Sequence, residues 1–125
     1  MEKKILIVDD EKGICDNLSE VFQLREYDVT TANSGREALD KIKSTFFSLI
    51  LLDVRIPDID GMQILKEAVK LNPESKVIMI TGYNEKGVKE KCLELGASAF
   101  FTKPLDFTQL LKTISDLHEQ NPQNP

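Results

Sequence analysis

Five short apolar runs alternate along the chain with segments whose apolar residues recur at helical spacing. The length of these runs and their content of β-branched and aromatic residues predict β-strands. The predicted strands are residues 4–8, 27–32, 48–52, 76–80 and 98–102.

The segments after these runs repeat apolar side chains every three or four residues, which is the period of an amphipathic helix. The repeats are Ile14, Leu18, Val21 and Phe22; Ala38, Leu39 and Ile42; Met62, Leu65 and Val69; Val88, Cys92 and Leu95; and Phe107, Leu110, Leu111 and Ile114. Helix ends are indicated by Asn72-Pro73 and by Gly96.

Alternating strands and helices predict right-handed crossovers and a parallel sheet covered by helices on both faces, a doubly wound α/β fold. The runs at 4–8, 48–52 and 76–80 are almost wholly apolar, as in strands buried on both faces, whereas the threonines in 27–32 indicate an edge strand. We expect one domain over residues 1–118. The polar, proline-containing residues 119–125 are expected to form a flexible tail or the stub of a linker.

Composition narrows the class of protein. The chain has 125 residues, of which 41% are hydrophobic and 30% charged, and this suits one compact domain. The net charge of −5 argues against direct nucleic-acid binding, and no apolar stretch is long enough to cross a bilayer. The two cysteines have neither disulfide nor metal-ligand spacing, so we interpret them as packing residues in a reducing cytoplasm.

Polar residues follow four of the predicted strands. Asp9 and Asp10 follow the first, Asp53 the third, Thr81 the fourth and Lys103 the fifth. Each alone has an ordinary structural explanation, such as a charge near a helix N-terminus or a solvated lysine. In doubly wound sheets, however, ligands bind outside the carboxyl ends of the strands, so we expect these five side chains to converge on one crevice.

The chemistry of this set is that of phosphoryl transfer. Three carboxylates in one crevice repel each other and need a counter-charge, and an all-oxygen acidic site suits Mg²⁺. An ammonium group at Lys103 and a hydroxyl group at Thr81 suit the oxygens of a phosphoryl group. Since a carboxylate can itself act as a nucleophile and form an acyl phosphate, the residues predict phosphoryl transfer onto an aspartate.

Four motifs stand in order along the chain: "ILIVDDE", "LLDVRIPDIDG", "MITGY" and "FFTKP". Together they resemble the response-regulator receiver domain of two-component signalling, over essentially the whole chain. The resemblance implies a flavodoxin-like (βα)5 fold of three layers, with a five-stranded parallel sheet of strand order 2-1-3-4-5. It also implies a phosphorylation-activated signalling switch whose only activities are its own phosphorylation and dephosphorylation.

The resemblance assigns roles to the converging residues. Asp53 would be the phosphoacceptor and would take the group from the phosphohistidine of a sensor kinase or a phosphotransfer protein. Asp10, Asp53 and the backbone carbonyl of Arg55 would ligate Mg²⁺, with Asp9 assisting through water. Lys103 would contact a phosphoryl oxygen.

A conformational switch is also implied. Thr81 would contact the phosphoryl group and move toward it, and Phe100 would swing inward behind it. The Lys103-Pro104 bond would be cis. The response would reach the face formed by the fourth helix, fifth strand and fifth helix, where we expect Gly87, placed within the fourth helix, to weaken that helix by ~1 kcal/mol relative to alanine.

Loop residues around the site are expected to shape its backbone and to set the lifetime of the phosphorylated form. Pro57 fixes one backbone dihedral after Asp53, and Gly61 gives the start of the next helix room near the site. In the family, the positions of Arg55 and Tyr83 vary and flank the phosphoryl group, while Gly82 leaves space for it, so these three would modulate the lifetime of the phosphorylated form. The pairing of Arg55 with Tyr83 is similar to that in the sporulation-relay and nitrogen-regulation branches.

Three alternatives are open at this point. A haloacid-dehalogenase-like, Mg²⁺-dependent phosphatase needs a second aspartate two positions after the nucleophile, where this chain has Arg55. A flavodoxin-like flavin binder needs a Ser-, Thr- and Gly-rich phosphate loop where this chain has "DDEK". A receiver-like interaction module independent of phosphorylation would not require the complete set of site residues.

The resemblance also implies partners. A sensor histidine kinase or a histidine phosphotransfer protein would donate the phosphoryl group. A downstream effector domain or protein would bind the face of the fourth helix, fifth strand and fifth helix. A homodimer is a further option. We expect a cytoplasmic location, with no membrane partner.

Overall fold

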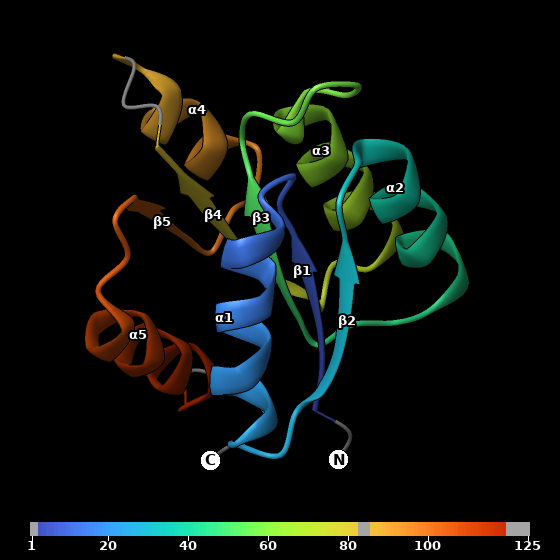
Figure 1. The fold of residues 1–125 in the computed structure, drawn as a ribbon. Coiled ribbons are helices and arrows are strands. Elements are labelled where there is room, and N and C mark those ends of the chain that lie inside the picture. Colours follow the sequence, from blue (N-terminus) through green and yellow to red (C-terminus); the bar gives the residue numbers. More distant parts are fainter. Residues whose placement is uncertain (1–2, 83–85, 120–125) are drawn as a thin grey trace.

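The computed structural model describes residues 3–82 and 86–119, and its centre is a five-stranded parallel sheet (Figure 1). The strands are β1 (Lys4–Val8), β2 (Asp28–Ala32), β3 (Leu49–Asp53), β4 (Lys76–Thr81) and β5 (Ala99–Thr102). Their order, β2-β1-β3-β4-β5, is the predicted one, and it places β2 at an edge as expected.

Five helices connect and cover the strands. They are α1 (Lys12–Gln23), α2 (Gly35–Ser44), α3 (Gly61–Leu71), α4 (Val88–Glu94) and α5 (Phe107–Glu119). Figure 1 shows α1 and α5 on one face of the sheet and α2, α3 and α4 on the other, so the fold has the three predicted layers. None of the described helices is long and apolar enough to span a membrane.

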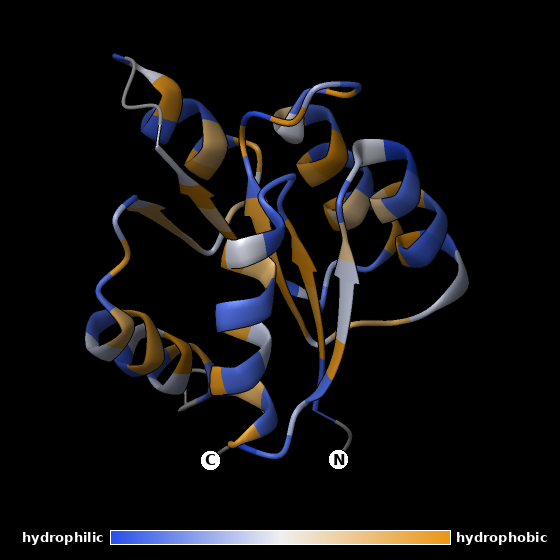
Figure 2. Cartoon of the chain, viewed as in Figure 1, coloured by the Kyte–Doolittle hydropathy of each residue, from blue (hydrophilic) through white to orange (hydrophobic). Residues whose placement is uncertain are grey.

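The two faces of the sheet carry separate hydrophobic clusters, because successive side chains of a strand point to opposite faces. Ile5 and Ile7 of β1 pack with α1 and α5, whereas Leu6 and Val8 pack with α2, α3 and α4. Figure 2 shows the result as continuous apolar colouring on β1, β3 and β4 and a paler β2. The central strands are buried on both faces, which explains their unbroken apolar sequences.

Side-chain caps stabilise the beginnings of α2 and α3. The Ser34 hydroxyl accepts a hydrogen bond from the backbone N–H of Glu37 and so caps the start of α2, and the Glu37 carboxylate accepts one from the backbone N–H of Asn33, just before the cap. Asp60 caps α3 by accepting from the backbone N–H of Met62. The predicted helix ends are also correct, since α3 ends at Leu71 and Gly96 follows α4 with a φ of 109°.

The expectation for Gly87 is wrong. Gly87 is the N-cap of α4 rather than a residue within it, and its backbone is left-handed, with a φ of 87°. Glycine adopts this conformation without the steric cost that a Cβ atom brings, so Gly87 serves the turn into α4 and does not weaken the helix interior. At the other end of the chain α5 runs to Glu119, one residue beyond the predicted domain boundary, and residues 120–125 lie outside the described part.

Candidate phosphoacceptor site

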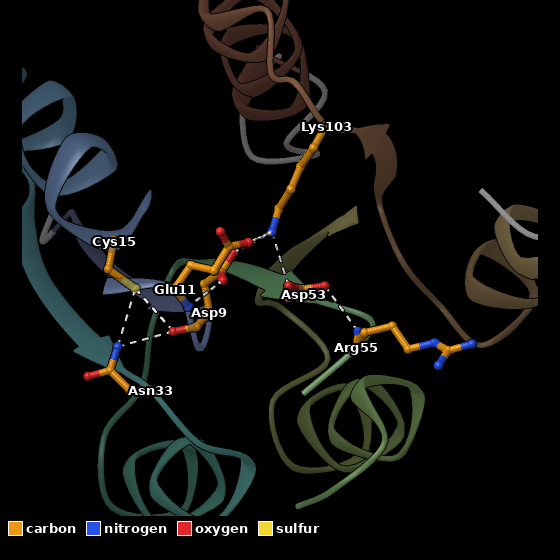
Figure 3. A network of polar contacts seen from close by, with 7 residues as sticks. All are labelled: Asp9, Glu11, Cys15, Asn33, Asp53, Arg55 and Lys103. Carbon is orange, nitrogen blue, oxygen red and sulfur yellow. Dashed lines mark hydrogen bonds and ion pairs between the residues drawn. The ribbon is translucent and has the colours of Figure 1, made fainter. Parts of the chain in front are cut away.

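The carboxyl ends of β1, β3 and β5 bring acidic and basic side chains together at one edge of the sheet (Figure 3). Asp53 is the last residue of β3, while Asp9 follows β1 directly and Lys103 follows β5 directly. Asp10 belongs to the same group, because one oxygen from each of Asp9, Asp10 and Asp53 lies within 4.8 Å of the others. Four of the five side chains expected to converge, those of Asp9, Asp10, Asp53 and Lys103, therefore lie together.

Lys103 is the counter-charge of this crevice. Its Nζ lies 2.9 Å from Asp9 Oδ2, 3.1 Å from Asp53 Oδ2 and 3.3 Å from Glu11 Oε1. The two aspartates are almost fully buried, with 3% and 5% of their surface exposed, so their charges cannot be offset by water alone. One ammonium group thus bridges two buried carboxylates and one exposed carboxylate.

The remaining carboxylate oxygens of the buried pair accept hydrogen bonds from the backbone. Asp9 Oδ1 accepts from the N–H of Glu11 at 2.9 Å, and Asp53 Oδ1 accepts from the N–H of Arg55 at 3.0 Å. Each aspartate therefore bonds the N–H two residues ahead, which is how an Asx turn redirects a chain leaving a strand. Asp53 is held by its own loop on one oxygen and by Lys103 on the other.

The charges of Asp53 and Lys103 perturb each other's titration. Burial raises the pKa of Asp53, and the N–H of Arg55 and the charge of Lys103 oppose this rise. Burial alone would lower the pKa of Lys103, but its hydrogen bonds to Asp9 and Asp53 and their negative charges outweigh burial and raise the pKa. Lys103 therefore stays charged at neutral pH.

The donor set fits a hard divalent cation. Asp9, Asp10 and Asp53 offer only oxygen ligands, two from buried positions and one, Asp10, from an exposed position. Mg²⁺ prefers such ligands and keeps several waters, which an opening to solvent on the Asp10 side accommodates. The backbone of Arg55 lies next to this group, whereas its side chain points away from the Asp53 carboxylate (Figure 3).

Thr81 and Phe100 share one face of the sheet. In the pairing of β4 with β5, Met79 is in register with Phe100 and Thr81 with Thr102. Phe100 is partly buried against the cluster that contains Met79, on the side of α2, α3 and α4. Residues two apart on a strand point to the same face, so the fully buried Thr81 lies on the Phe100 side and nearer the crevice.

Glycines permit close approach around the loop after β3. A Cβ atom at Gly61 would collide with the carbonyl oxygen of Asp53 and would lie 2.8 Å from Val54 Cα, so the predicted need for room at Gly61 is met. A Cβ atom at Gly82 would lie 3.8 Å from Lys103 Cδ, so the space at this glycine adjoins the lysine.

The Lys103-Pro104 bond is cis, as expected. Tyr83 lies outside the described residues.

Three contacts at the site were not anticipated from the sequence. The Glu11 carboxylate forms an ion pair with Lys103. The sequence places Glu11 directly after Asp9 and Asp10, but this ion pair was not predicted from it. Asn33 Nδ2 and Cys15 Sγ both donate to the backbone carbonyl of Asp9, at 3.1 and 3.4 Å, and no local pattern indicates this. Burial raises the pKa of the Cys15 thiol to about 11, so it acts here as a neutral donor.

A fourth such contact holds the loop after β3 against α2. The Asp58 carboxylate accepts hydrogen bonds from the backbone N–H groups of Gly35 and Arg36, at 2.8 and 3.0 Å. These two bonds lower the pKa of Asp58. The loop that begins at Asp53 is thereby fastened to the first turn of the neighbouring helix, where the N–H groups have no partner within the helix.

Comparison with known proteins agrees with this geometry. The family model of the response regulator receiver domain matches residues 5–115. The sporulation initiation phosphotransferase F of Bacillus subtilis (strain 168) is 40% identical over 91% of this chain and 92% of its own length. A CheY-like receiver domain from Methanospirillum hungatei JF-1 has a solved structure with a TM-score of 0.93 and 35% identity, covering 100% of both chains.

Other relatives are longer than this chain. The transcriptional regulatory protein ZraR of Escherichia coli (strain K12) is 39% identical over 88% of this chain, which corresponds to 25% of ZraR. The chain therefore spans about a quarter of the length of this relative.

Proposed function

The chain belongs to the response regulator receiver domain family, whose members are phosphorylation-activated switches of two-component signalling, and on this premise we propose that Asp53 is the phosphoacceptor. The observation that carries the proposal is the position of Asp53 at the end of a buried strand, with Lys103 Nζ 3.1 Å from Oδ2. A nucleophile on a rigid strand is held in place for in-line attack, and a fixed cation beside it stabilises charge on the transferred group.

The proposed reaction transfers one phosphoryl group. An Asp53 carboxylate oxygen attacks the phosphorus of a partner's phosphohistidine, a new O–P bond forms, and the P–N bond breaks with its electron pair returning to the imidazole. Lys103 exchanges one of its carboxylate contacts for a phosphoryl oxygen. Hydrolysis of the resulting acyl phosphate resets the domain, so its own phosphorylation and dephosphorylation are the only activities we propose for it.

Mg²⁺ is the proposed cofactor, held by Asp10, Asp53 and the backbone carbonyl of Arg55, with Asp9 assisting through water. The close group of three carboxylates supports this assignment. When bound, the ion supplies positive charge against the phosphoryl oxygens and relieves the repulsion among the carboxylates. The side chains of Arg55 and Tyr83, together with the space at Gly82, are proposed to set how readily water attacks the acyl phosphate.

The proposed switch runs from Thr81 to Phe100. A phosphoryl oxygen at Asp53 gives the Thr81 hydroxyl a charged acceptor, and movement of Thr81 alters the space that Phe100 can occupy on the same face. Two alternative arrangements of Thr81 and Phe100 on this face form a two-state element, and a bound group can shift the equilibrium between them. We propose that the face of α4, β5 and α5 then changes its affinity for an effector.

Receiver domains interact with kinases and effectors, and here the proposed phosphodonor is a cytoplasmic sensor histidine kinase or a histidine phosphotransfer protein. The effector is a downstream protein or an attached domain. The relative of nearly equal length is called a phosphotransferase, and the longer relative is called a transcriptional regulator, so both arrangements occur among similar chains. A homodimer through the α4, β5 and α5 face is one proposed form of the active state.

Intact-mass spectrometry after incubation with phosphoramidate tests the proposed chemistry. We expect one phosphoryl adduct on the wild-type protein in Mg²⁺ and almost none in EDTA. Asp53→Asn should remove the adduct, whereas Asp40→Asn, which changes an exposed carboxylate on α2, should retain it. An adduct of equal yield on Asp53→Asn would exclude Asp53 as the phosphoacceptor.

A further inference from the structure

A pocket of about 360 Å³ lies at the end of the sheet opposite the aspartates. It forms where the C-terminal ends of α1 and α5 meet the residues that precede β1 and β2, and both helix ends lie there in Figure 1. The volume is within the range of small-ligand sites. Nothing in the proposed phosphoryl transfer uses this pocket.

Part of the pocket wall is apolar and firmly packed. Phe22 is fully buried and Ile114 is 4% exposed, and Leu111 lies beside them on α5. Tyr27 meets Phe22 edge to face, with ring centroids 5.2 Å apart. Phe22 and Ile114 are therefore covered by the protein itself, and Leu111 with the edge of Tyr27 forms the apolar surface that the pocket leaves accessible.

The rest of the pocket is cationic. Lys3 Nζ donates to the backbone carbonyl of Arg25 at 3.0 Å and lies 4.6 Å from the centre of the Tyr27 ring. Arg25 itself donates to the carbonyl of Val21 at 3.4 Å. Both cations are therefore positioned by neutral groups, and the described lining residues include no carboxylate. This arrangement is notable in a chain with a net charge of −5.

The pKa of His118 reflects the same excess of positive charge. His118 lines the pocket from α5, and its pKa is lowered by burial and then by the positive charges of Lys3 and Lys76. The electrostatic field at the pocket would therefore favour an anion.

We propose that this pocket binds a small organic anion with an apolar body, such as an aromatic carboxylate. Its apolar part packs on the half-buried Leu111 and on the exposed edge of Tyr27, and its carboxylate faces Lys3 and Arg25. Apolar contact and charge are both required, since an inorganic anion leaves Leu111 and the edge of Tyr27 uncovered and a neutral aromatic leaves the two cations without a counter-charge.

The single histidine of the chain makes the test direct, because the imidazole proton resonance of His118 is unique in the spectrum. The probe is phenylacetate, compared at constant ionic strength with phenylacetamide, which lacks the charge, and with acetate, which lacks the ring. We expect phenylacetate to raise the pKa of His118 and to shift the amide resonances of residues 27, 111 and 115. Phenylacetamide and acetate should bind at least about tenfold more weakly, as expected for the loss of one charge-assisted or apolar contact.

Substitutions identify the cations. Lys3→Gln and Arg25→Gln should each weaken phenylacetate binding by about tenfold. Lys43→Gln, which removes an exposed charge on the opposite face of the sheet, should leave it unchanged. The proposal is overturned if phenylacetate produces no saturable shift, if either comparison compound binds as tightly, or if both pocket variants bind like the wild-type protein.

Discussion

Replacing Lys103 by methionine tests whether one ammonium group neutralises the acidic crevice. Methionine keeps much of the length and apolar character of the lysine stem but removes the charge. In the variant, Asp9 and Asp53 lose contacts of 2.9 and 3.1 Å while remaining almost fully buried. The perturbation therefore leaves two neighbouring negative charges without their cation.

The expected cost follows from this burial. Removing one partner of a buried ion pair costs about 3–5 kcal/mol. Because the Lys103 side chain retains 16% exposure and the crevice opens to solvent, we expect the lower limit, about 3 kcal/mol. In a domain of this size, that loss lowers Tm by roughly 10 °C.

The assay is thermal unfolding in EDTA, followed by circular dichroism. Lys112→Met is the matched control, because Lys112 is 68% exposed and pairs with Asp116 at 3.5 Å, so its loss should cost less than about 1 kcal/mol. Mg²⁺ should restore more stability to Lys103→Met than to the wild-type protein, since the ion replaces the missing charge. Equal losses in the two variants would refute the role of Lys103 as counter-charge.

Four further substitutions probe the same structure by thermal unfolding. Asp10→Asn should raise Tm by about 2 °C in EDTA, since it removes one of three repelling charges, and should abolish the stabilisation by Mg²⁺; an unchanged Mg²⁺ response would contradict its role as a ligand. Gly61→Ala should cost at least about 1–3 kcal/mol through collision with the β3 backbone, whereas Gly13→Ala, with open space around its Cβ position, should stabilise by about 0.5–1 kcal/mol. Glu26→Gly should raise Tm by about 2–4 °C, because Glu26 has a left-handed backbone with a φ of 66°; a lower Tm would show that its side chain stabilises the turn.

Local patterns were sufficient to predict the strands, the helices and a doubly wound α/β fold class. The strands differ from the predicted ranges by no more than one residue at any end, because runs such as "KILIV" are short, apolar and flanked by polar residues. The site was also predictable, since parallel strands carry their carboxyl ends to one edge and the residues that follow must meet there. The resemblance to a family added the strand order and the individual roles.

Long-range geometry accounts for what the sequence did not reveal. That Lys103 bridges three carboxylates depends on side-chain distances across β1, β3 and β5, and no spacing along the chain encodes them. The Asp58 contacts to α2 span more than twenty residues. The predicted position of Gly87 was wrong because a glycine next to an amphipathic segment is compatible both with a helix interior and with a left-handed cap. Only the backbone dihedral distinguishes the two.

The most direct test of the central claim, that phosphorylation at Asp53 changes a distant surface, is the amide NMR spectrum with beryllofluoride and Mg²⁺. Beryllofluoride stands in for the phosphoryl group without a covalent transfer step. In the wild-type protein we expect shifts at the loops around Asp53 and also across α4, β5 and the start of α5, residues 86–108, and neither set in Asp53→Asn. Shifts confined to the loops around Asp53, with residues 86–108 unchanged, would contradict the account.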